Sequence, residues 1–155
     1  MRTAVRTGTA ALLLALAAMI GGTPGAAQEA GDAGGDGADT GRLLAELNKL
    51  EGVEAGCRSF FLFRNDTDVT LAGFEMSLAV LDRDGVIDRL LTIDAAPLPS
   101  RRTTLKLFDI PDMPCADIGE VILHDIATCE AEGGGVADCF AILDLSSRAD
   151  VPFVL

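Results

Sequence analysis

The sequence predicts a mostly β fold: one antiparallel β-sandwich domain that begins with a short helix and is held by two disulfides. Three observations carry this prediction. Apolar and polar residues alternate in short runs after residue 57, residues that favour turns separate those runs, and the four cysteines form an even set. At 155 residues, the chain has the length of a single domain.

The composition excludes several classes of function. The formal net charge is −12 and only two residues are lysine, so the surface repels nucleic-acid phosphates instead of neutralising them. Seven phenylalanines and no tryptophan or tyrosine leave few side chains for stacking on bases or sugars. A single histidine, His124, excludes a catalytic or metal-binding cluster of histidines within one chain. We therefore expect no nucleic-acid partner, no enzyme activity and no cofactor.

Residues 1–27 are expected to be a cleaved secretory signal peptide. Arg2 and Arg6 form its positive start, an uninterrupted apolar run fills 10–20, and small residues follow. The apolar run has eleven residues, whereas a membrane span takes about 20. We therefore expect cleavage near Gln28, a periplasmic or secreted protein, and no membrane span after cleavage.

Residues 28–40 are expected to be a flexible linker, because they are rich in glycine, alanine and acids and hold no apolar side chain larger than alanine. The foldable unit is then 41–155. Loss of 1–27 removes two arginines and no acid, so the net charge becomes −14. Such a charge favours solubility and disfavours contact with an anionic membrane surface.

A short helix is predicted over 42–51. Leu43, Leu44, Leu47 and Leu50 follow helical spacing and form one apolar stripe. An isolated helix of this length is marginal in water, so the stripe must pack on its own domain or on a partner.

Alternating runs predict the strands of the sandwich. The expected strands cover 58–64, 74–81, 86–93, 103–107 and 120–127, with a strand or a helical turn at 139–145 and an edge strand at 151–155. The run 60–63 is apolar throughout, which is typical of a strand covered on both faces. Asp84-Gly85 lies between two alternating runs and predicts a hairpin. Short strands separated by turns favour an immunoglobulin-like β-sandwich.

All four cysteines lie in the part expected to be exported, where an even count predicts two disulfides. We expect Cys129 to pair with Cys139, because three glycines between them let the chain reverse. Cys57 then pairs with Cys115. No C-x-x-C motif is present, which disfavours thioredoxin-type chemistry and a zinc ribbon. The alternative is a soft-metal site, since Met113 and Cys115 supply ligands that copper prefers.

Two polar motifs each allow two interpretations. Arg101 and Arg102 form the one basic doublet of the acidic domain. They can receive a carboxylate or phosphate from a partner, or they can open an edge strand and block edge pairing. Asn65, Asp66 and Thr67 match a glycosylation sequon, which we interpret as a turn in an exported chain of bacterial type.

Five short motifs carry a family resemblance: Gly56-Cys57-Arg58, Arg64-Asn65, Leu81 to Ile87, Lys106 to Asp109, and Ser146-Ser147-Arg148. Through them the stretch 41–155 resembles a group of small uncharacterised exported proteins of alphaproteobacteria, often labelled Tat pathway signal sequence domain proteins. The resemblance implies a periplasmic, disulfide-bearing domain without an established activity. The leader of this chain departs from that label because it lacks paired arginines.

The sequence thus predicts a non-catalytic periplasmic β-sandwich module that binds a protein or an envelope partner. The alternative is a small periplasmic protein that binds a soft metal or carries out thiol redox chemistry. The two differ in the number of free thiols in the native protein, which is zero for the module and two or four for the alternative.

Overall fold

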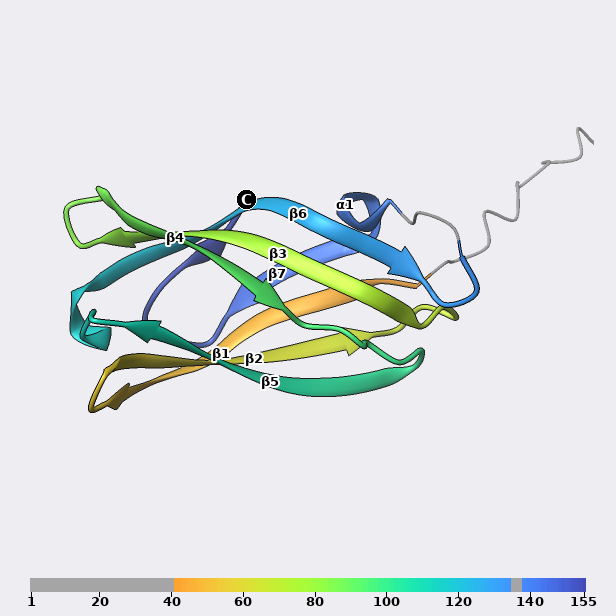
Figure 1. Cartoon of the computed structure of the whole chain (residues 1–155), viewed down its shortest axis with the longest axis horizontal. Coiled ribbons are helices and arrows are strands. Elements are labelled where there is room, and N and C mark those ends of the chain that lie inside the picture. The colour runs from red at the N-terminus through yellow and green to blue at the C-terminus, as the bar shows by residue number, and fades with distance from the viewer. Residues whose placement is uncertain (1–40, 135–137) are drawn as a thin grey trace, which may run out of the picture. The chain divides into compact units, whose positions relative to one another are not determined.

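Figure 1 shows a computed structural model of the chain, which describes residues 41–134 and 138–155. The predicted signal peptide (1–27) and linker (28–40) lie outside the described residues. In chain order the elements are β1 (Leu43–Val53), β2 (Gly56–Asn65), β3 (Leu71–Asp82), β4 (Ile87–Asp94), β5 (Arg102–Pro111), the 3-10 turn η1 (Cys115–Asp117), β6 (Ile118–Ala131), the short helix α1 (Cys139–Ile142), β7 (Leu143–Ser147) and β8 (Phe153–Val154).

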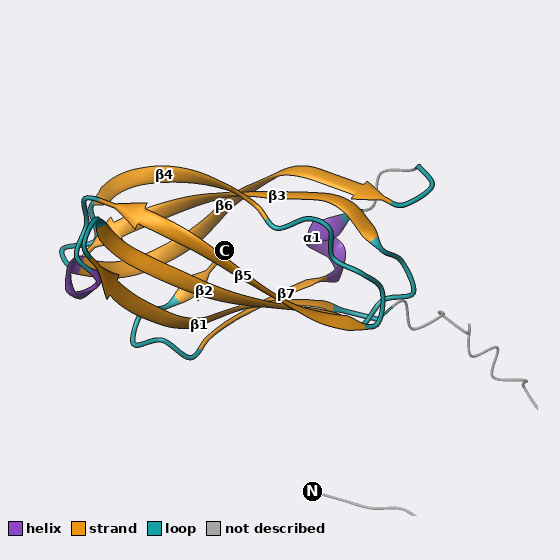
Figure 2. Cartoon of the chain, turned by 60° about the horizontal axis from the view of Figure 1, so that its bottom comes forward, coloured by secondary structure: helices purple, strands orange, loops and turns teal. Residues whose placement is uncertain are grey.

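The strands form two sheets of four, which pack face to face (Figure 1). Sheet A has the order β5-β2-β1-β7, and sheet B has the order β4-β3-β6-β8. The two helical turns, η1 and α1, lie at opposite ends of the sandwich (Figure 2). The mostly β fold is confirmed, and the strands predicted after residue 57 are present. The segment 139–145 holds both α1 and the start of β7.

Strand β1 replaces the helix that the sequence predicts over 42–51. Leu43, Ala45 and Leu47 are fully buried, and this alternation is the period of a strand. β1 lies between β2 and β7, so its backbone pairs on both sides. This pairing outweighs the helix propensity of its leucine, alanine, glutamate and lysine residues.

A β-bulge explains why β1 imitates helical spacing. Residues 47 and 49 pair with consecutive residues of β2, so Asn48 is an extra residue. It shifts the alternation by one position, and Leu50 packs against the core. Core-facing leucines therefore fall at 43, 47 and 50, which is also the i, i+4, i+7 spacing of a helix.

The prediction of a purely antiparallel sandwich is wrong, because each sheet contains one parallel pair of strands. β7 pairs in parallel with β1, and β8 pairs in parallel with β6. The strands of each pair begin at the same end of the sandwich, because the connections before β7 and before β8 both reverse the chain and carry it to the other sheet. Antiparallel pairs therefore make up the rest of each sheet, while the parallel pairs lie along one side.

The core lies between the sheets and is built from the inward side of each strand. Phe61 and Phe63 of β2 face it from sheet A, while Phe74 of β3 and Phe153 of β8 face it from sheet B. The ring centroids of Phe61 and Phe153 lie 5.4 Å apart, and those of Phe63 and Phe74 lie 6.1 Å apart, both edge to face. These aromatic contacts join the two sheets.

Two cationic side chains form hydrogen bonds across the side of the sandwich where the edge strands β4 and β5 lie. Arg89 of β4 donates through Nη1 to the carbonyl oxygen of Pro111, at the end of β5. Lys106 of β5 donates through Nζ to the carbonyl oxygen of Ala96, just after β4, at 2.7 Å. Inward-pointing charges on edge strands also discourage pairing with another chain.

The hairpin predicted at Asp84-Gly85 is present between β3 and β4. Gly85 has a φ of +77°, a conformation that is strained for most other residues. Asp82 holds the turn, because its Oδ1 accepts hydrogen bonds from the backbone N–H groups of Asp84 and Val86, each at 2.9 Å. A Cβ added at Gly85 would meet no atom within 4 Å, so the cost of a side chain comes from the backbone alone.

We expect Gly85→Val to lower the free energy of unfolding by about 1–2 kcal/mol, because a β-branched residue is strained at positive φ. Gly85→Asn is the control, since asparagine tolerates the left-handed region and should cost much less. Urea unfolding measures both variants. Equal stability of the valine variant and the native chain would contradict this account of the turn.

Candidate functional site

Two disulfides lie at the two ends of β6, in the pairing expected from the sequence. Cys57 of β2 is bonded to Cys115 of η1, and Cys129 of β6 is bonded to Cys139 of α1. Each bond therefore lies where the chain passes between the sheets, from β5 to β6 and from β6 to β7. Disulfides persist in oxidising compartments, so this pair indicates an exported environment.

The cysteines of this structure do not act as thiolate ligands, because all four sulfurs are bonded in disulfides. Met113, the other soft ligand considered from the sequence, is 4% exposed and packs in the core. Within 41–134 and 138–155, no group of three or more histidine, cysteine, aspartate or glutamate side chains could hold a metal ion.

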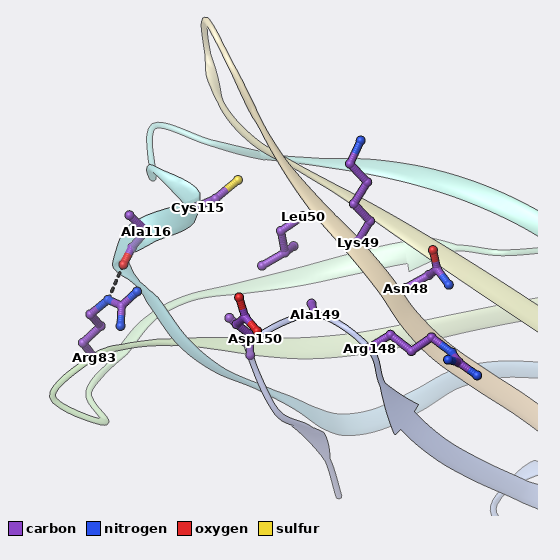
Figure 3. Close-up of a pocket in the computed structure, with 10 residues that line it drawn as sticks. Asn48, Lys49, Leu50, Arg83, Cys115, Ala116, Arg148, Ala149 and Asp150 are labelled. Atoms are coloured by element: carbon purple, nitrogen blue, oxygen red, sulfur yellow. Dashed lines mark hydrogen bonds between the residues drawn. The ribbon is translucent and has the colours of Figure 1, made fainter.

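An open pocket of about 410 Å³ lies at the η1 end of the sandwich (Figure 3). Its walls come from the bulge of β1, from η1, from the turn after β3 and from the loop between β7 and β8. Arg83 lines it and donates through Nε to the carbonyl oxygen of Ala116. Lys49 and Arg148 also line it, but they direct their charged ends away from it (Figure 3).

A second hollow, of about 530 Å³, shares Cys115 and Ala116 with the first pocket. It lies between the turn joining β1 to β2 and the segment before η1, and Val53 and Met113 are among its apolar walls. The lining of the two hollows offers a guanidinium and exposed carboxylates beside apolar surface. That combination can hold a small polar group, but it places no nucleophile against a base.

A polar network around Glu46 ties β1 to β7 and to the loop that follows. Glu46 is 9% exposed, and its carboxylate accepts hydrogen bonds from Asn48 Nδ2 at 2.9 Å, Arg148 Nε at 3.0 Å and Ser146 Oγ at 3.5 Å. The hydrogen bond from Asn48, supported by Arg148, holds the pKa of the Glu46 carboxyl below its usual range against the opposing effect of burial. The bulge residue Asn48 thus helps to keep the Glu46 carboxylate ionised although Glu46 is nearly buried.

Arg101 and Arg102, which the sequence suggests as a contact for an anion or a partner, differ in their surroundings. Arg101 has a φ of +55° and forms an ion pair with Asp68, with Nη2 2.8 Å from Oδ1. Arg102 begins β5 opposite Asn65, is exposed, and has no polar side-chain partner among the described residues. Of the doublet, Arg102 is therefore the side chain that is available to a ligand.

Asn65 of the sequon is a buried structural residue with no exposed surface. Its Nδ2 donates to the carbonyl oxygens of Val69 at 2.8 Å and Leu98 at 3.0 Å, while its Oδ1 accepts from the Thr67 backbone N–H at 3.0 Å and from Thr67 Oγ1 at 2.6 Å. These bonds join the connection between β2 and β3 to the connection between β4 and β5. The folded domain therefore withholds this asparagine from any modifying enzyme.

The outer face of sheet A carries an apolar patch. Phe60 and Leu62 of β2 are half-buried, and Leu105 and Leu107 of β5 are 53% and 46% exposed. Phe60 pairs with Leu107 and Leu62 pairs with Leu105, so the four side chains form one block, which we call the sheet A patch. The prediction that 60–63 is covered on both faces is wrong, because nothing in the described chain covers this outer face.

Charged side chains frame the sheet A patch. At one end, Arg58 Nε lies 2.6 Å from Asp109 Oδ1 and Arg58 Nη2 lies 3.0 Å from Asp109 Oδ2. This pairing raises the pKa of Arg58 and lowers the pKa of Asp109. On the side of β1, Lys49 Nζ lies 5.1 Å from the centre of the Phe60 ring. At the other end, Arg64 is exposed and has no polar side-chain partner among the described residues.

Sequence reasoning missed the sheet A patch because it depends on the orientation of β5. Leu105 and Leu107 alternate with Lys106, and leucine is ordinarily the buried partner in such a pattern. Here Lys106 points inward to reach the carbonyl oxygen of Ala96, and the leucines face outward. The register of β5 against the outward residues of β2 is the signal that reveals the patch.

Comparison with family models, with curated proteins and with solved structures found no match for this chain. Among the residues that the structure describes, no helix has the length and apolar character needed to cross a bilayer. The candidate sites therefore stand on their own geometry.

We expect loss of the Cys57–Cys115 bond to destabilise the fold more than loss of the Cys129–Cys139 bond. The bonds join residues 58 and 10 positions apart, for which the chain-entropy model gives roughly 4 and roughly 2.7 kcal/mol. Replacing both cysteines of a pair by alanine leaves no unpaired thiol, and urea unfolding compares the two double variants. A smaller loss for the Cys57→Ala, Cys115→Ala variant would refute the ranking.

Glu46 should stabilise the fold only while it is ionised. Its pKa is lower in the folded chain than the usual value of about 4.3, so its contribution is complete above that pH and disappears as the pH falls through the folded value. We expect Glu46→Gln to cost about 1 kcal/mol at about pH 7 and little at about pH 2. Urea unfolding at both pH values tests this. Glu54→Gln, at an exposed turn residue, is the control for loss of one charge, and a pH-independent cost at Glu46 would contradict the expectation.

Proposed function

We propose that this protein is a non-catalytic module, exported to the periplasm, that binds a protein partner through the outer face of sheet A. The observation that carries the proposal is the sheet A patch. Contiguous apolar side chains on a soluble protein, rimmed by polar groups, are typical of interaction surfaces. Phe60, Leu62, Leu105 and Leu107 form such a block within a charged rim.

The rim supports a protein partner in particular. Arginine and aromatic side chains are enriched at the centres of protein interfaces, and this face has a phenylalanine with arginines at both ends of the patch. Arg64 lies at one end of the patch on the outer face, where it pairs with Thr103. Arg102 pairs with the buried Asn65, so it falls on the inward side of the alternation of β5 and is not part of this rim. Arg64 is exposed and has no polar side-chain partner among the described residues, so it is available to a carboxylate of the partner.

The two disulfides and the leader pattern support export. The bonded cysteines need an oxidising compartment, and residues 1–27 have the composition of a signal peptide. Bonded sulfurs also support a binding module over a protein that carries out thiol redox chemistry, because the latter needs a thiolate.

We infer that the sandwich is immunoglobulin-like in its central strands. In that fold, strands A, B and E lie in one sheet, and strands C′, C and F lie in the other. The order β1, β2, β5 in sheet A and β4, β3, β6 in sheet B supports this assignment. The parallel placement of β7 and β8 is a departure that is specific to this chain.

Capture of envelope proteins by the tagged chain tests the proposed function. Leu105→Glu places a charge in the sheet A patch, and Leu90→Glu, on β4 of sheet B, is a matched control because the two leucines are 53% and 60% exposed. We expect the native chain and the Leu90→Glu variant to capture the same proteins, and the Leu105→Glu variant to lose them. Unchanged capture by the Leu105→Glu variant would sink the proposal.

A further inference from the structure

The sheet A patch is self-complementary in charge, and we propose that it binds a second copy of this chain in a two-fold dimer. This inference rests on the proposed function, since it names the partner of the same face. In a two-fold dimer both copies use the same surface, so that surface must be complementary to itself. The distribution of charge along β2 and β5 meets this requirement.

The two ends of the patch differ in charge. The outward residues of the two strands, taken pair by pair across the register, are Arg58 with Asp109, Phe60 with Leu107, Leu62 with Leu105, and Arg64 with Thr103. At the first end Asp109 neutralises Arg58, and the Asp109 side chain stays 53% exposed. At the second end Arg64 has no polar side-chain partner among the described residues, so that end is positive.

A two-fold axis that lies in the plane of the interface and runs perpendicular to the strands brings these two ends together. Such an axis lays each strand over the same strand of the other copy, running in the opposite direction. The apolar rows then meet at the centre. Arg64 of one copy lies over Arg58 of the other copy, which is flanked by Asp109 on β5 and by Glu51 on β1. Because a carboxylate can accept several hydrogen bonds, the exposed oxygens of Asp109 can take Arg64 as a second donor.

The alternative two-fold axis, along the strands, does not satisfy the charges. It places Arg64 of one copy over Thr103 of the other and brings both Arg64 side chains to the same end. Both guanidinium groups then lack a carboxylate and repel each other. The free arginine therefore selects the perpendicular axis.

The charges of the remaining surface favour the same face. Each copy has a net charge of −12, so two copies approach only where acids are neutralised. The four acids on the strands of sheet A each bind a cation: Glu46, Glu51, Asp109 and Asp144. On sheet B, β6 presents three acids that have no ion pair in the described chain: Glu120, Asp125 and Glu130.

Sedimentation of the full, disulfide-bonded chain tests the dimer through a charge exchange. In a dimer of identical copies, Arg64→Glu brings a carboxylate against Asp109 and Glu51, and Asp109→Arg brings a guanidinium against Arg58 and Arg64. Each variant should therefore raise the dissociation constant about tenfold or more. An equimolar mixture of the two variants restores opposite charges at both ends and should recover the native dimer. Arg64 has no polar side-chain partner and the Arg58–Asp109 pair is exposed, so both variants should fold.

The outcomes separate this inference from the proposed function. A native chain that stays monomeric up to about 1 mM overturns the dimer, as does a mixture of the two variants that remains monomeric. In either case the capture experiment tests the proposed function separately. If the native chain captures envelope proteins and the Leu105→Glu variant does not, the protein is still a binding module, but with a partner other than a second copy of itself. A native dimer that Leu105→Glu dissociates and Leu90→Glu preserves supports the dimer through this face.

Discussion

The stability of this sandwich depends on how the chain is held where it passes from one sheet to the other. Along the described strands the chain changes sheet five times, and the buried layer between the sheets persists only while those connections keep the sheets in place. Disulfides hold the two crossings on either side of β6. Asn65 holds two more through the carbonyl oxygens of Val69 and Leu98. At the last crossing, Ser147 Oγ donates to the carbonyl oxygen of Val151 at 2.6 Å.

Because the crossings and the core hold the two sheets together, the outer faces of the sheets remain available for binding. The sheets are joined through their inner side chains and their crossings, and the outward residues of β2 and β5 do not take part in joining them. Both strands are long and paired with each other over ten positions, which makes the sheet A patch a rigid platform and not a mobile loop. Lys106 and Arg89 close the edge beside this platform, which directs a partner toward the face and away from the unpaired edge of β5.

Structural features that depend on residues close together in the sequence could be predicted from it. Features that depend on residues far apart in the sequence could not. Alternation and Asp-Gly located β2 to β6, because strand period and turn chemistry are local. β1 was missed because one bulge residue, Asn48, converts strand spacing into helical spacing. The burial of Asn65 depends on a backbone oxygen 33 residues away, and the outward direction of Leu105 depends on the register with β2. Neither the burial of Asn65 nor the direction of Leu105 can be inferred from the residues next to it in the sequence.

The parallel pairing of β1 with β7 gives the domain a mechanical property. A force that pulls the start of β1 away from the end of β7 acts along both strands, so it shears the ladder between Leu43–Leu47 and Leu143–Ser147. Sheared strands must lose several hydrogen bonds together, whereas a hairpin pulled open at its free end loses them one after another. The Cys129–Cys139 bond also limits how much chain can extend just before β7. A domain tethered on the side of Gly41 would therefore resist extension through the ladder of sheet A itself.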